Sequence, residues 1–138
     1  MRQYKAECVT RYDNTVATAS SAGQLKQGFG AAMAATLTQD AAMHRLWYDL
    51  RNQSLFDDSY RGDVLEIDQS LERMIWRIVS KFAELAGTPL TVSPSTAYAL
   101  LDGLFQQALL KHLAGRADAA ADLAGNVEQV LDLLTRGP

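Results

Sequence analysis

Hydrophobic residues in this chain recur at intervals of three and four, the spacing of amphipathic helices. The pattern is clearest between residues 62 and 86, where one face carries Val64, Ile67, Leu71, Met74, Ile75, Ile78, Phe82 and Leu85. No stretch shows the sustained alternation, bounded by turn residues, that is typical of strands. The pattern therefore predicts an all-α fold, a bundle of six helices without a sheet.

Local signals indicate where these helices begin and end. Gly87 can adopt the left-handed conformation that closes a helix, and Pro89 blocks its continuation. Ser93 is a suitable N-cap residue, and Pro94 suits the first helical position. The predicted helices span about residues 3–19, 24–37, a segment around Trp47 and Tyr48 capped by Thr38 or Asp40, 62–86, 94–113 closed by Gly115, and 118–135 capped by Asp118.

Two glycines weaken the predicted helix over residues 24–37. Gly28 and Gly30 each cost about 1 kcal/mol relative to alanine in a helix interior. They mark either a kink or a close contact with another element.

Length and composition favour one globular domain over residues 1–138. The chain has 48% hydrophobic and 21% charged residues, a net charge of −3 and a pI near 5.3. This balance argues against a disordered chain, and the scattered basic residues argue against direct binding to nucleic acid. No apolar run approaches the roughly 20 residues that cross a bilayer, and no secretion signal is present, so we expect a cytoplasmic protein without membrane contact. The single cysteine, Cys8, fits a reducing compartment and is expected to pack as a small hydrophobic residue.

Motifs of catalysis and metal binding are absent from the sequence. The two histidines, His44 and His112, belong to no zinc-ligand spacing, and there is no phosphate-binding glycine loop or nucleophile–histidine arrangement. We therefore expect no enzyme activity, no metal and no cofactor.

One helix face combines polar groups that suit ligand binding. His44, Tyr48 and Arg51 are spaced four and three residues apart and so share a face. A few polar groups can orient a ligand in an otherwise apolar pocket. The alternative is a solvated flank of the helix.

Apolar and aromatic residues of several predicted helices can line a cavity beside this face. They are Phe29, Met33, Trp47, Met74, Ile78, Phe82, Leu104 and Phe105. The alternative is a solid core, because methionine also fills irregular gaps. Trp76 lies at the edge of the polar face of its helix, which predicts contact with another helix or with a second subunit.

The order of these elements carries a family resemblance. The segment LWYDLRNQSLF over residues 46–56 precedes a very long helix, and a proline-containing break leads into AYALLDGLFQQALLKHLAG over residues 97–115 and a final Leu/Val helix. This arrangement resembles the C-terminal ligand-binding and dimerisation domain of TetR-family (tetracycline-repressor type) transcriptional regulators. The resemblance covers essentially the whole chain and is strongest over residues 42–115.

The resemblance implies a homodimer whose last two helices form a four-helix bundle with those of the partner. Gly103, with the small residues around it, suits a closely packed seam. The implied interface residues are Leu101, Gly103, Ala108, Leu109, His112, Leu123, Val127, Val130, Leu131 and Leu134.

The resemblance also implies a function. A small hydrophobic or aromatic effector would bind among the first five helices, shift the helix over residues 3–19 and so change DNA affinity. Family members carry a helix-turn-helix domain before that helix, whereas this chain starts at what looks like the connecting helix. We therefore expect DNA contact only through a domain not in this chain, and leave open a truncation, a misassigned start or a native lack. The alternative function is a dimeric helical-bundle interaction protein without a ligand.

Overall fold

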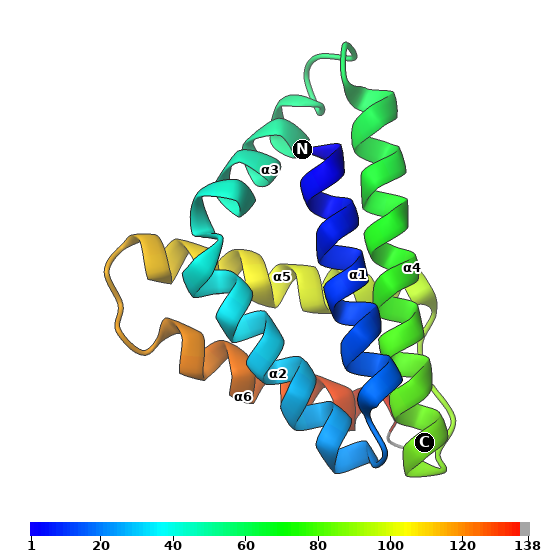
Figure 1. Cartoon of the computed structure of the whole chain (residues 1–138). Helices are drawn as coiled ribbons and strands as arrows, with labels where there is room; N and C mark the ends of the chain where they lie inside the picture. Colours follow the sequence, from blue (N-terminus) through cyan, green and yellow to red (C-terminus); the bar gives the residue numbers. More distant parts are fainter. Residues whose placement is uncertain (136–138) are drawn as a thin grey trace.

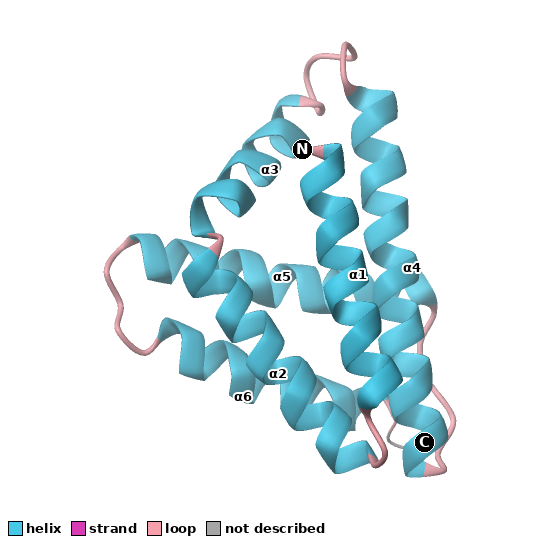
Figure 2. Cartoon of the chain, in the orientation of Figure 1, coloured by secondary structure: helices cyan, strands magenta, loops and turns pink. Residues whose placement is uncertain are grey.

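The computed structural model describes residues 1–135, and all regular structure in this range is helical (Figure 2). The predicted all-α class and its six helices are therefore confirmed for this part of the chain. The helices are α1 (Arg2–Thr18), α2 (Ala22–Gln39), α3 (Ala41–Gln53), α4 (Arg61–Ala86), α5 (Pro94–Leu113) and α6 (Ala119–Leu134).

Most helix ends follow from the local sequence. Ser93 Oγ accepts a hydrogen bond from the Thr96 amide at the start of α5, and Gly87 closes α4 with φ of 70°. Asp40 and Asp118 occupy N-cap positions but cap no amide with their side chains. The Asp40 carboxylate accepts a hydrogen bond from Arg11 instead.

The helices form two crossed groups (Figure 1). α1 and α4 lie side by side and run in the same direction, while α5 and α6 run antiparallel across the back of the molecule. α2 packs on α6, and α3 packs on the middle of α5. The inward faces of all six helices contribute to one buried core.

Close contact explains one of the two glycines in α2. A Cβ at Gly30 would lie 3.0 Å from the carbonyl oxygen of Ala124, so only glycine lets α2 approach the α6 backbone this closely. A Cβ at Gly28 would meet only the Thr15 methyl group, at 3.5 Å. Gly103 differs, because a Cβ there would have no neighbour within 4 Å in the chain, and the residue is exposed.

Most of the residues predicted at the dimer interface do not lie on an outer face of the chain. Seven of them face the core of the single chain and are at most 6% exposed: Leu101, Ala108, Leu109, Leu123, Val127, Leu131 and Leu134. Their hydrophobic periodicity reports burial between helices, which the sequence alone does not separate from burial against a partner. Gly103 is exposed, and His112 and Val130 are half-buried.

The outer face of α5 and α6 carries a different set of apolar side chains. Leu100, Leu110 and Leu113 on α5 and Leu133 on α6 are 45–70% exposed. Trp76 is half-buried and packs against the core, in agreement with the predicted contact between helices. None of the helices in residues 1–135 has the length and hydropathy to cross a membrane.

Candidate functional site

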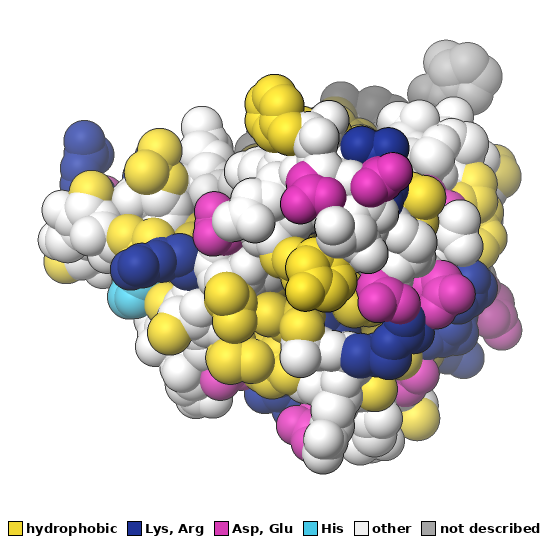
Figure 3. Space-filling model, turned by 90° about the horizontal axis from the view of Figure 1, so that it is seen from above, with side chains coloured by type: hydrophobic (Ala, Val, Ile, Leu, Met, Phe, Trp, Pro, Cys, Tyr) yellow, Lys and Arg dark blue, Asp and Glu magenta, His cyan; other side chains and the backbone are white. Residues whose placement is uncertain are grey.

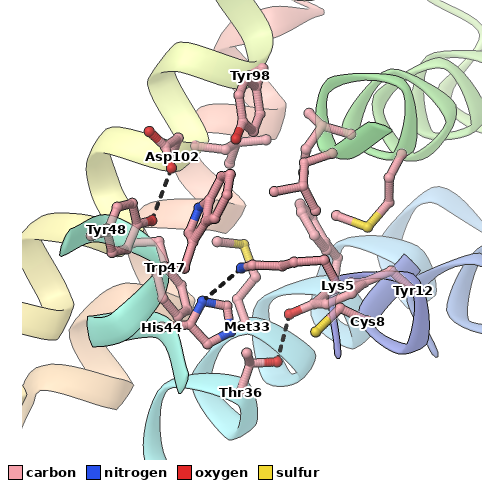
Figure 4. A pocket seen from close by; sticks show the side chains of 16 residues that line it. Lys5, Cys8, Tyr12, Met33, Thr36, His44, Trp47, Tyr48, Tyr98 and Asp102 are labelled. Carbon is pink, nitrogen blue, oxygen red and sulfur yellow. Dashed lines mark hydrogen bonds between the residues drawn. The ribbon is translucent and has the colours of Figure 1, made fainter. Parts of the chain in front are cut away.

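A cavity of about 70 Å³ lies among α1, α2, α3, α4 and α5 (Figure 4). Its wall is almost entirely apolar and aromatic, with a few polar groups at its two ends. Seven of the residues predicted to bind ligand line it: Phe29, Met33, His44, Trp47, Tyr48, Met74 and Phe105.

Four predicted ligand-binding residues lie outside the cavity wall. Ile78 and Phe82 are buried in the core further along α4, and Leu104 is half-buried on α5. Arg51 lies at the edge, where it bonds to a residue of the wall. Nine wall residues were not predicted: Lys5, Cys8, Tyr12, Thr36, Leu71, Ile75, Tyr98, Leu101 and Asp102.

Lys5 is the unusual residue of this cavity. It extends from α1 toward α3, is only 5% exposed, and belongs to none of the ion pairs of the described residues. Its Nζ lies 5.1 Å from the centroid of the Trp47 ring, a cation–π distance. Burial lowers the pKa of Lys5 to about 8, since the charged ammonium loses its water.

His44 is the hydrogen-bond partner of Lys5. The distance from Lys5 Nζ to His44 Nδ1 is 3.3 Å, and because an ammonium can only donate, Nδ1 accepts and the ring hydrogen lies on Nε2. Among the described residues Nε2 is buried without a partner. Burial and the neighbouring Lys5 charge lower the pKa of His44 to about 3, so the imidazole is neutral.

Aromatic packing fixes the position of this histidine. The His44 ring lies 4.7 Å from the Phe105 ring and 5.6 Å, edge to face, from the Tyr4 ring. Elsewhere in the wall, the Tyr12 hydroxyl donates a hydrogen bond to Thr36 Oγ1 at 2.7 Å, and the Thr36 hydroxyl donates in turn to the Ala32 carbonyl. The cavity is therefore lined by side chains that hold one another in place.

A polar cluster closes the opposite end of the cavity, where α3, α4 and α5 meet. Arg51 Nη2 donates to Asp102 Oδ2 at 2.7 Å, and the Tyr48 hydroxyl donates to Asp102 Oδ1 at 2.9 Å (Figure 4). Arg51 also reaches Asp68, which accepts a hydrogen bond of 2.6 Å from Tyr98. Burial, with the nearby Asp102 carboxylate, raises the pKa of Tyr48 and of Tyr98, so both hydroxyls stay protonated donors. These five residues are called the polar cluster below.

A wider groove lies on the far side of the polar cluster. It has a volume of about 630 Å³, and Arg51 and Asp68 belong to its wall. Leu55, at the beginning of the α3–α4 loop, and Leu65, in the first turns of α4, line it as well and are exposed. This end of the molecule carries a patch of hydrophobic side chains with acidic and basic groups around it (Figure 3). The polar cluster thus stands between a small cavity and a larger groove.

Comparison with protein-family models, curated proteins and solved structures finds no match for this chain. The site is therefore interpreted from its own geometry and from the resemblance in the sequence.

Four of the unpredicted wall residues had a sequence signal. Lys5, Cys8 and Tyr12 follow the three-and-four spacing of one inward helix face, although a lysine in that position is usually a surface residue. Asp102 interrupts an otherwise apolar helix, which indicates a polar partner for its carboxylate. The sequence does not show that this partner is Arg51 or Tyr48. Nothing in the sequence indicated that Lys5 of α1 would contact His44 of α3, which lies 39 residues away.

Proposed function

We propose that this chain is the effector-binding and dimerisation domain of a TetR-type transcriptional regulator. The observation that carries the proposal is the cavity, because α1 supplies part of its wall through Lys5, Cys8 and Tyr12. In the arrangement that the sequence resembles, the helix corresponding to α1 connects the sensing domain to the DNA-binding domain. A ligand in this cavity would touch that connecting helix directly.

The mechanism requires two positions of α1. A ligand shifts their populations only if it binds one position more tightly than the other. Lys5 and Tyr12 both lie in the wall and both bond to other helices, to His44 of α3 and Thr36 of α2. A ligand that displaces either bond would change how α1 is held against α2 and α3.

The polar cluster gives this site a way to take larger ligands. The cavity itself is small, with a volume of about 70 Å³. Release of the Arg51–Asp102 ion pair would join the cavity to the groove of about 630 Å³, within the roughly 300–1,000 Å³ of ordinary ligand sites. Arg51 thereby keeps a role in ligand binding, at the mouth of the site instead of in its wall.

Dimerisation is assigned to the outer face of α5 and α6. Leu100, Leu110, Leu113 and Leu133 leave apolar surface on this face, which a second copy would cover. Gly103 lies on the same side of α5, with open space beside it for a partner helix.

Methyl NMR of the methionines tests the ligand site. Met33 and Met74 line the cavity, so their methyl groups report on ligand binding there. Met43 does not line it and serves as the internal control. Titration with small aromatic probes, from benzene to indole, is expected to give saturable shifts at Met33 and Met74 and none at Met43. The Arg51→Ala variant is expected to bind the larger probe, indole, more tightly than the parent chain does.

The alternative is a dimeric helical-bundle interaction protein without a ligand, which the small volume of the cavity favours. Absence of saturable shifts with every probe, in both the parent chain and Arg51→Ala, would support this alternative and remove the sensor. The regulator part has a separate test, because a helix-turn-helix segment encoded in frame upstream of Met1 would supply the DNA-binding domain that the proposal needs.

A further inference from the structure

A buried lysine without a carboxylate partner is costly to keep in an apolar cavity. Transfer of an ammonium from water into such a site is unfavourable unless an opposite charge accompanies it. Two carboxylates at the polar end of the cavity are engaged elsewhere: Asp102 by Arg51 and Tyr48, and Asp68 by Arg51 and Tyr98. The Lys5 ammonium bonds to the His44 ring nitrogen and lies over the aromatic rings of Tyr4 and Trp47. Burial lowers its pKa, while Cys8 and Asp102 are near enough to raise it against this effect.

The wall favours a neutral ligand over an anion. Asp102 is itself part of the wall, so a carboxylate or phosphate beside Lys5 would lie near an existing negative charge. The remaining surface consists of aromatic and aliphatic side chains, which suit a short hydrocarbon chain. A neutral molecule that reacts with an amine satisfies both conditions, and a volume of about 70 Å³ favours a small one.

We propose that Lys5 is a covalent binding site for a small aliphatic aldehyde, which it holds as a reversible imine. This inference rests on the proposed function, because it names the class of effector that the same cavity would sense. Lysines removed from water in apolar pockets are the ones that form such adducts.

The reaction uses only groups in the cavity and the ligand. The lone pair of Lys5 Nζ forms a bond to the carbonyl carbon, and the C=O π electrons move to oxygen. The proton passes from nitrogen to the departing hydroxyl, which leaves as water while the C=N bond forms. His44 Nδ1, at 3.3 Å from Nζ, orients the amine by a hydrogen bond, since its pKa of about 3 makes it too weak a base to carry the proton. No oxidant or reductant is needed, and the addition of water reverses the step. The product, when protonated, keeps its positive charge beside the Trp47 ring.

The protonation state of the Lys5 amine supports this chemistry. With a pKa of about 8, about a quarter of Lys5 is neutral at pH 7.5. A fully solvated lysine with a pKa near 10.4 is neutral in only about one molecule per thousand at that pH. Lys5 is therefore expected to react about two-hundred-fold faster than solvated lysines at equal access.

Reductive trapping tests the proposal. The full chain is incubated at pH 7.5 with propanal and sodium cyanoborohydride, and peptides are mapped by mass spectrometry. We expect one propyl group at Lys5 before Lys26, Lys81 or Lys111 is modified, with the Met1 amine as a second reactive group that mapping separates. The trapping rate at Lys5 should rise with pH and level off near pH 8. Modification of the Met1 amine and the other lysines with Lys5 untouched would overturn the proposal.

Variants separate the chemistry from folding and from the proposed function. Lys5→Arg keeps the charge but forms no imine, so the Lys5 adduct should vanish while trapping at Met1 continues. His44→Phe removes the hydrogen bond that orients the amine and should slow trapping at Lys5 by roughly two- to ten-fold, the effect of one lost hydrogen bond, while trapping at Met1 is unchanged. If Lys5 fails to react while the methyl groups of Met33 and Met74 still respond to benzene, the covalent site is wrong and the sensor stands. If neither occurs, both proposals fail.

Discussion

At the scale of single residues, the cavity is defined by two basic side chains whose pKa values are lowered by burial. The pKa of His44 is lowered to about 3 and that of Lys5 to about 8, in each case first of all by loss of water around the charged form. Each shift makes stability depend on pH, because the folded chain binds fewer protons than the unfolded chain over the range between the two pKa values.

Acid should destabilise this protein through His44. The unfolded histidine takes up a proton near pH 6.5, whereas the folded one stays neutral until about pH 3, so the free energy of unfolding falls as pH drops through this range. Between pH 6.5 and pH 4.5 the loss should be about 2 kcal/mol. Urea unfolding of the parent chain and of His44→Phe should show a shallower pH slope in the variant. His112→Phe is the matched control, and an equally shallow slope there would contradict the assignment.

Lys5 should make stability depend on pH in the alkaline range. Its folded pKa lies below its unfolded value of 10.5, so the cost of burying the charge is fully present below pH 8 and disappears as pH rises toward 10.5. Lys5→Met should therefore be more stable than the parent chain at pH 7, by about 3 kcal/mol, and the difference should shrink toward pH 10. Thermal or urea unfolding at several pH values measures it, with Lys81→Met as the control for loss of a lysine. A difference that does not change with pH would show that Lys5 is solvated in the folded chain.

At the scale of helices, the close approach of α2 and α6 sets the back wall of the molecule. These two helices make the most extensive contact in the chain, and Gly30 stands against the Ala124 carbonyl at its centre. The same helix contains Gly28, which faces only a methyl group.

The two glycines give a matched test of this contact. Alanine improves helix propensity by about 1 kcal/mol at either position. Gly28→Ala should therefore stabilise the chain by up to about 1 kcal/mol. Gly30→Ala should destabilise it by about 1–3 kcal/mol, because its Cβ would lie 3.0 Å from a backbone oxygen that cannot move alone. Chemical denaturation measures both, and equal effects would mean that α2 and α6 are further apart.

Helices could be predicted from the sequence because their signals are local. Ser93, Pro94 and Gly87 act within one turn, and the apolar spacing of α4 reports its inward face directly. The face of α5 that points to the core could not be predicted in the same way, because apolar residues occur all around this helix. Leu109 is buried and Leu110 is exposed, although both are leucines in the same apolar run.

At the scale of the whole molecule, the cavity depends on contacts between residues far apart in the sequence. The aromatic and methionine residues of its wall could be predicted as a group, since they fall on the apolar faces of several helices. The pairing of Lys5 with His44 and of Arg51 with Asp102 could not, since both pairs follow from the crossing of helices that the sequence does not orient. Phe82 shows the converse error, because it shares the inward face of α4 but lies beyond the reach of the cavity.

The proposed dimer makes opposite predictions for two neighbouring leucines of α5. Leu110 is 70% exposed on the outer face, so Leu110→Asp should abolish the dimer in sedimentation experiments and leave the helix content unchanged. Leu109 is 4% exposed in the core, so Leu109→Glu should unfold the chain, since a buried carboxylate without a partner costs several kcal/mol. Leu65→Asp is the matched control, because Leu65 is an exposed leucine of α4, away from the proposed interface, and should leave the dimer intact.

Two results would contradict this placement of the interface. A parent chain that sediments as a monomer at micromolar concentration would remove the dimer itself. Dissociation by Leu65→Asp with no effect of Leu110→Asp would move the interface to the end of the molecule where α3 meets α4. In that case a partner would cover the groove beside Arg51, and ligand access through the polar cluster would depend on the state of assembly.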